Sequence, residues 1–153
     1  MCKWVGLMIV LVVGIFSCAD EPATYPETAQ WTVNPNGDSE LALLMRAMYD
    51  DGVRVKHQII NGRKADSDVD LSRMYTADAT EPEKVASPQY AALGAAYENA
   101  VDALQRAKKD DADEHYQAMV NACMACHQAM CPGPKERIKK MFFSKKQMAE
   151  LPH

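Results

Sequence analysis

The chain has 153 residues, about the length of one domain, and a net charge of −4. This charge gives no general affinity for nucleic acid, so no nucleic-acid partner is expected. Hydrophobic residues make up 48% of the chain and charged residues 25%, as in ordinary globular domains. Aromatic residues are sparse at 7% whereas there are 10 methionines, which favours adaptable helix packing over a β-sandwich.

Residues 1–17 have the pattern of an export signal. Lys3 supplies a basic start, and residues 5–16 form an apolar run shorter than the ~20 residues of a transmembrane helix. Ser17 and Cys18 then resemble the end of a bacterial lipobox, which implies cleavage before Cys18 and lipidation of its thiol. Cleavage nearby without a lipid and an uncleaved membrane anchor are the alternatives. All three predict an exported domain, in the periplasm or on the outer surface of a bacterium.

Residues 18–37 follow as a predicted tether between the lipid anchor and the folded domain. Three prolines and Gly37 are spread among polar residues, which is typical of an extended linker. The domain itself is expected to span residues 38–153, and Asp38 or Ser39 can cap its first helix.

Helical periodicity then recurs along the domain. Apolar residues fall at steps of three and four in the segments 40–61, 88–108 and 110–130, more weakly in 68–76, and a short basic helix fits 135–146. Gly62 is placed to end the first of these helices, and Pro88 to begin a later one, after a loop that contains Pro82. The pattern predicts an all-α fold, an antiparallel four-helix bundle with a short second helix and a short C-terminal helix.

Cys123, Cys126 and His127 form a Cys-x-x-Cys-His motif, the pattern of covalent haem attachment. Residues at i, i+3 and i+4 share one helix face, so two thiols one turn apart can add to the two vinyl groups of one porphyrin edge. The imidazole that follows the second thiol then reaches the iron as its proximal ligand. The motif predicts one covalent haem c per chain.

Two other chemistries also use a Cys-x-x-Cys pair. A structural zinc site needs four ligands, and the sequence offers no second pair. A thioredoxin-like redox pair occurs in a βαβ context, which the helical pattern does not supply. Cys131 is left as a spare thiol in the exported domain, and we expect it to be free and buried.

The late position of the motif, on the last long predicted helix, resembles the cytochrome c prime family of four-helix-bundle c-type cytochromes. The resemblance covers residues 38–143 and rests on the motif and its position, with the helix pattern as support. At the third and fourth positions after the histidine the family usually has an aromatic residue and an arginine, where this chain has Met130 and Cys131. The resemblance implies that a first-helix methionine ligand makes an electron carrier, whereas its absence leaves a five-coordinate haem that binds small gases.

Met45 and Met48 lie on the apolar face of the first predicted helix, level with the end of the haem helix in an antiparallel bundle. We expect Met45, or alternatively Met48, to be the sixth iron ligand, although packing alone also accounts for a methionine on such a face. Arg46 and Arg137 are the candidate contacts of the haem propionates, with solvation as the alternative for each.

These residues predict an electron carrier rather than an enzyme. A gas-binding haem protein and a haem subunit of a larger enzyme are the alternatives. The six basic residues of segment 135–146, which follow the haem helix, would steer an acidic redox partner, or else form a solvated face. The membrane is expected as a partner through the N-terminal lipid, and a homodimer is left open.

Overall fold

The computed structural model describes residues 38–151, which are mostly helical and contain no strand. The α-helices are α1 (Glu40–Ile60), α2 (Pro82–Val85), α3 (Pro88–Arg106), α4 (Ala112–Ala129), α5 (Lys135–Ile138) and α6 (Lys145–Ala149). Short 3-10 helices are η1 (Leu71–Tyr75), η2 (Lys109–Asp111) and η3 (Lys139–Met141). The all-α prediction is therefore confirmed. The predicted signal, the predicted lipidation at Cys18 and the predicted tether lie outside the described residues.

The ends of the long helices follow from local chemistry. The side chain of Ser39 caps α1, because its Oγ accepts a hydrogen bond from the backbone N–H of Ala42 at 3.2 Å. Gly62 lies just beyond the end of α1 with a φ of 64°, a left-handed conformation that favours glycine. Pro88 occupies the first turn of α3, where the missing N–H costs nothing.

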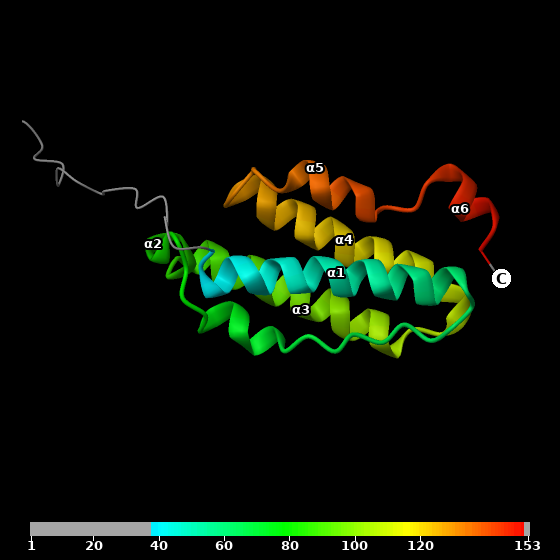
Figure 1. Cartoon of the computed structure of the whole chain (residues 1–153). Helices are drawn as coiled ribbons and strands as arrows, with labels where there is room; N and C mark the ends of the chain where they lie inside the picture. The colour runs from blue at the N-terminus through cyan, green and yellow to red at the C-terminus, as the bar shows by residue number, and fades with distance from the viewer. Residues whose placement is uncertain (1–37, 152–153) are drawn as a thin grey trace, which may run out of the picture. The chain divides into compact units, whose positions relative to one another are not determined.

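The three long helices supply most of the core. Helix α4 packs against both α3 and α1, and Figure 1 shows these helices running alongside one another. Tyr116 and Val120 of α4 are completely buried at 0% exposure, and Leu104 of α3 and Val55 of α1 are 1% exposed. Burying each such side chain stabilises the fold by about 1.5–3 kcal/mol. Within residues 38–151, no helix combines the length and the apolar character needed to cross a membrane.

Two connecting segments differ from the sequence prediction. Pro82, expected in a loop, begins the single-turn helix α2, where proline is tolerated at the first position. The prediction of one basic helix over residues 135–146 is wrong, because the chain becomes extended at Phe142 and restarts as α6 after Ser144. The break places the ring of Phe143 5.1 Å from that of Tyr116, centroid to centroid. The break thus accompanies burial of that ring, which is 9% exposed.

Lys56 of α1 is buried beneath this C-terminal segment, with only 7% of its surface exposed. Its Nζ donates a hydrogen bond to the carbonyl oxygen of Phe142 at 2.7 Å and lies 5.4 Å from the ring centroid of Phe143. Burial disfavours the ammonium form and lowers the pKa of Lys56 below its ordinary value.

This lowered pKa predicts a pH-dependent stability. Between the pKa in the folded protein and the ordinary value of 10.5, the unfolded chain binds more protons than the folded chain. The free energy of unfolding should therefore rise with pH across that interval. Urea unfolding of the wild type and of Lys56→Met is compared at about pH 8 and about pH 10. All other groups titrate in both proteins, so the change with pH in the difference between their free energies of unfolding comes from Lys56. A difference between the two proteins that does not change with pH would contradict it.

Candidate haem site

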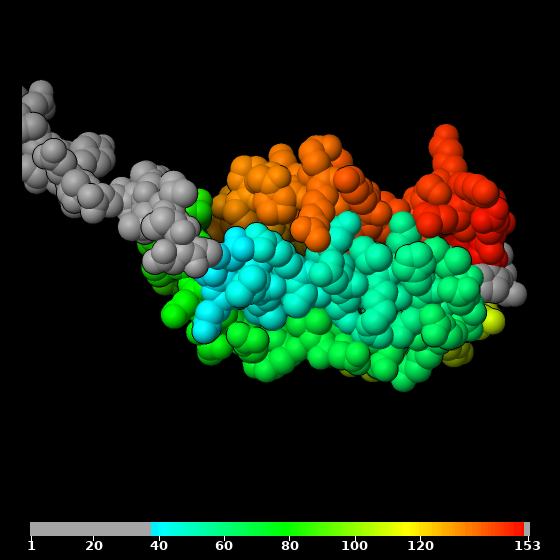
Figure 2. All heavy atoms as spheres, viewed as in Figure 1, coloured from blue at the N-terminus to red at the C-terminus, as the bar shows by residue number. Residues whose placement is uncertain are grey.

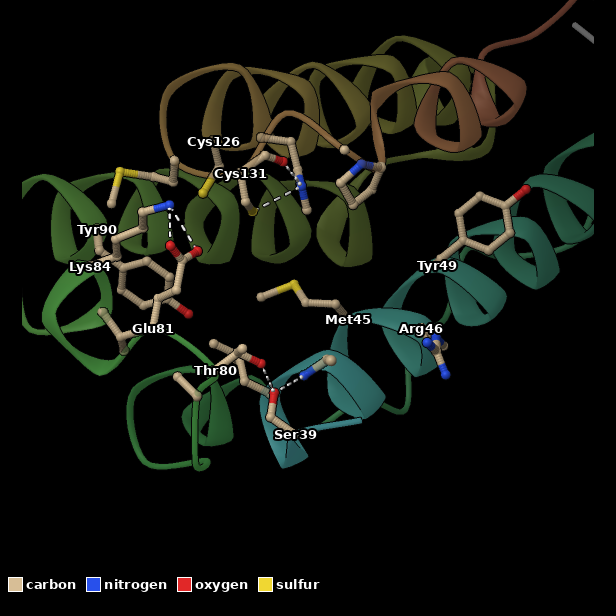
Figure 3. Close-up of a pocket in the computed structure, with 18 of the residues that line it drawn as sticks. Ser39, Met45, Arg46, Tyr49, Thr80, Glu81, Lys84, Tyr90, Cys126 and Cys131 are labelled. Atoms are coloured by element: carbon tan, nitrogen blue, oxygen red, sulfur yellow. Dashed lines mark hydrogen bonds and ion pairs between the residues drawn. The ribbon is translucent and has the colours of Figure 1, made fainter. Parts of the chain in front are cut away.

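A cavity of about 590 Å³ lies between the first half of α1, the segment around α2 and the end of α4 (Figure 3). Its volume falls within the range of ~300–1,000 Å³ that is typical of small-molecule and cofactor sites. The wall is largely apolar, with side chains that include Leu41, Met45, Val85, Tyr90, Met130 and Ile138. The cavity therefore has the size and the apolar lining that a large, flat cofactor needs.

The predicted motif faces this space from α4. Cys126 and His127 line the large cavity, and Cys123 joins them around a smaller adjoining cavity of about 40 Å³. Both thiols are partly buried, and His127 is 9% exposed. The helical spacing thus brings all three residues to one face of α4, as the sequence predicted.

The ring of His127 is held through one of its two nitrogens. Its Nδ1 lies 3.1 Å from the carbonyl oxygen of Cys131 and 3.3 Å from the Sγ atom of the same residue. A carbonyl oxygen can only accept, so Nδ1 carries the proton and the lone pair remains on Nε2. Histidines that bind a metal usually donate their other ring N–H in this way. The tautomer of His127 therefore fits iron coordination through Nε2.

The two cysteines of the motif are protonated thiols at neutral pH. Burial raises the pKa of Cys123 to about 12, and it also raises the pKa of Cys126. Thioether formation with a vinyl group consumes the thiol and leaves no charge to be buried, whereas zinc requires thiolates. Within residues 38–151, no group of three or more His, Cys, Asp and Glu side chains is placed to hold a metal ion. The neutral thiols thus fit porphyrin attachment.

Met45 and Met48 have different positions relative to the cavities. Met45 lines both cavities, and Figure 3 shows its side chain extending from α1 into the larger one. Met48 is 7% exposed and lines only the smaller cavity. Both methionines therefore stay candidates for the predicted sixth ligand. Met45, the candidate that we prefer, is the one that also lines the larger cavity.

Arg46 and Arg137 lie at the rim of the larger cavity, each paired with an aspartate. Arg46 binds Asp38, with Nη2 2.6 Å from Oδ1, and half of its side chain is exposed. Arg137 of α5 binds Asp50 at 3.5 Å and lies 4.3 Å above the ring centroid of Tyr49. This contact joins α5 to α1, whose atoms meet in Figure 2. Propionate binding by the two arginines stays a prediction, and it would require each to exchange or share its partner.

Cys131 corrects one expectation, because it is exposed and not buried. Helix α4 ends at Ala129, and Pro132 disfavours a helical conformation for the residue before it. Cys131 therefore lies outside the helix, where it is exposed, lines the larger cavity and has its Sγ atom 3.3 Å from Nδ1 of His127.

The wall formed by α2 was not predicted. Glu81 and Lys84 form an ion pair of 2.7 Å that lines the cavity opposite α1, and Tyr90 of α3 lies beside it (Figure 3). The hydroxyl of Tyr90 donates to the carbonyl oxygen of Met74 at 2.9 Å, and burial raises the pKa of Tyr90 to about 12. The sequence predicts a loop at Pro82, and nothing in the local sequence indicates which cavity this segment lines.

The site thus combines two neutral thiols, a buried imidazole with a free Nε2, a thioether and an apolar cavity. Such a donor set can attach a porphyrin covalently and hold its iron from one side or from both. No protein-family model matches the chain, and neither a curated protein nor a solved structure matches it.

Proposed function

We propose that this protein is a c-type cytochrome that carries one covalent haem and transfers electrons. The observation that carries the proposal is the state of His127, which is buried, donates from Nδ1 and presents a free Nε2. Cys123 lies one helical turn before His127, and Cys126 lies directly before it. Both cysteines line the smaller cavity together with His127. This combination is what the covalent haem motif requires.

The residues of the site have distinct roles in this proposal. Cys123 and Cys126 would hold the porphyrin through thioethers, and His127 would bind the iron through Nε2. A bound haem supplies a one-electron couple, and the apolar wall of the cavity keeps water away from it. Met45, as a neutral thioether ligand, would favour the ferrous state and raise the reduction potential. Arg46 and Arg137 would neutralise the propionates at the rim.

The proposed architecture is an antiparallel four-helix bundle of the cytochrome c prime type, with η1 in the place of the short second helix. Its support is the composition of the cavity wall. Met45 comes from the first half of α1, whereas His127 comes from the last turns of α4. The start of one helix therefore lies level with the end of the other, as antiparallel packing requires.

The proposed setting is the periplasm or the outer surface, with a lipid on Cys18 as the membrane anchor and an acidic redox partner. Its support is the signal-like segment 1–17 and the basic segment 135–146. Most cations of the basic segment are exposed, although Arg137, Lys139 and Lys146 each have an acidic partner within 4.0 Å. Cell fractionation, together with mass spectrometry of the mature N-terminus, tests the anchor: an unmodified N-terminus beyond Cys18 would exclude it.

Extraction with acidified acetone tests the haem attachment. The solvent removes non-covalent haem, so the Soret band of the wild-type protein should stay with the polypeptide if Cys123 and Cys126 form thioethers. Extraction of all haem from the wild type would end the proposal of a c-type cytochrome.

A further inference from the structure

The turn after α4 brings one residue against the far side of the proposed iron ligand. Cys131 lies four residues beyond His127, at the point where Pro132 takes the chain out of the helix. Figure 3 draws the two contacts of Cys131 as dashed lines. The Nδ1–H of His127 therefore meets two acceptors from a single residue, the carbonyl oxygen at 3.1 Å and the thiol sulfur at 3.3 Å.

A simpler explanation exists for half of this arrangement. A histidine in the last turn of a helix often donates to one of the unpaired carbonyls there. That role explains the carbonyl contact, but it does not need the sulfur, which is a weak acceptor. The sulfur nevertheless lies 3.3 Å from the same nitrogen, although Cys131 is an exposed residue. The two acceptors together hold the ring with Nε2 directed away from the turn.

We propose that Cys131 is a positioning residue of the haem site, whose carbonyl and thiol together orient His127 and tune the bond between its Nε2 and the iron. This inference rests on the proposed function, because it concerns the ligand of the haem. It assigns a role to the thiol that thioether formation leaves free.

The direction of the effect follows from the charge on the ring. Acceptors at Nδ1 draw its proton outward and make the imidazole a stronger electron donor to the metal. Stronger donation favours the ferric iron and lowers the reduction potential. Removal of the sulfur should therefore raise the potential. We expect about a threefold change in the equilibrium constant for reduction, which is ~28 mV at 59 mV per tenfold.

Three variants test the proposal on the holoprotein. Cys131→Ala removes the sulfur and leaves the carbonyl, and Cys131→Ser returns an acceptor at the same position. Gln128→Ala is the matched control, because Gln128 is exposed on α4 next to His127. Each is made in the wild type and in Met45→Ala, where a five-coordinate ferrous iron allows the iron–histidine stretch to be seen by resonance Raman spectroscopy. The midpoint potential is measured in both backgrounds.

We expect Cys131→Ala to raise the potential and lower the stretching frequency, Cys131→Ser to return both toward the wild type, and Gln128→Ala to change neither. Two results together, with the haem still covalent, would overturn the role of Cys131 and leave the proposed function standing. Cys131→Ala would leave the potential unchanged in both backgrounds, and it would leave the stretching frequency unchanged in the Met45→Ala background. Extraction of the haem by acidified acetone from every protein would overturn both.

Discussion

Loss of covalent haem is the expected result of replacing Cys123 and Cys126 together with alanine. In the proposed site each thiol would supply one of the two bonds between the chain and the porphyrin edge. Cys131, which also lines the larger cavity, lies beyond the end of α4 and outside the motif. Acidified acetone should then remove essentially all haem from the double variant and essentially none from the wild type. Absorbance of the Soret band in the polypeptide and in the solvent measures both fractions.

The single variants and a matched control make this test specific. Cys123→Ala keeps the thiol of Cys126, so one thioether should hold the haem while the unsaturated second vinyl shifts the visible bands to longer wavelength. Ala125→Ser changes an exposed position inside the motif and should leave attachment intact. The helical circular dichroism should persist in all variants, since the most deeply buried core side chains, such as Tyr116 and Val120, lie outside the motif. A double variant that retains haem in the polypeptide would contradict attachment at these residues.

The long helices could be predicted because their signals are local. Ser39, Gly62 and Pro88 mark helix ends through their own hydrogen bonding and backbone preferences, and the apolar periodicity between them extends over several turns. The predicted ends of α1 lie within about a residue of the observed ones, and those of α3 and α4 within about two. Such features need no knowledge of the rest of the fold.

The short segments could not be predicted because tertiary contacts decide them. The residues of α2 form a single turn, too short for any periodicity to appear. At the C-terminal end, a continuous basic helix had support from propensity alone, whereas the observed break is set by Phe143 against Tyr116. Burial of such a ring stabilises the fold by about 1.5–3 kcal/mol, a contribution that helix propensity in the sequence does not reveal.

One part of the candidate site could likewise be predicted from the sequence, and another part could not. Cys123, Cys126 and His127 are fixed by spacing on one helix, so the sequence places them together. The contact of Cys131 with Nδ1 depends on how the chain turns after α4, and the Glu81–Lys84 wall depends on the packing of a remote segment. Neither contact can be predicted from the spacing of residues in the sequence, and both were found only in the structure.

Met45→Ala is expected to convert the haem iron from six-coordinate and low-spin to five-coordinate and high-spin. If Met45 is the sixth ligand, its thioether sulfur would complete a strong ligand field together with His127, and an alanine side chain is too short to replace it. The variant should lose the weak far-red ferric band that reports iron–sulfur bonding. Its reduction potential should fall, because the thioether stabilises the ferrous state, and its ferrous form should bind carbon monoxide readily. Absorption spectra of the two redox states, with and without carbon monoxide, measure each change.

Met48→Ala is the matched control on the same helix. Met48 is 7% exposed and packs in the core, so its truncation should lower the free energy of unfolding by about 2–5 kcal/mol. Met45 is only partly buried, and its truncation should cost less stability. If Met45 is the ligand, Met48→Ala should be the less stable protein and keep the low-spin spectrum. Met45→Ala should lose less stability but show the high-spin spectrum. Loss of the far-red band in Met48→Ala alone would exchange the roles of the two residues.

The wild-type spectrum decides between electron transfer and gas binding. A high-spin ferrous protein that binds carbon monoxide or nitric oxide without any substitution would show that neither methionine reaches the iron. Met45 would then serve only as part of the apolar wall, and the cavity beside it would be the binding space of a small gas. A low-spin wild type requires a sixth ligand, and Met45 is a neutral donor that lines the same cavity as His127 and extends into it from α1. In that case the iron keeps the same ligands in both oxidation states, which is the condition for rapid electron transfer with little rearrangement.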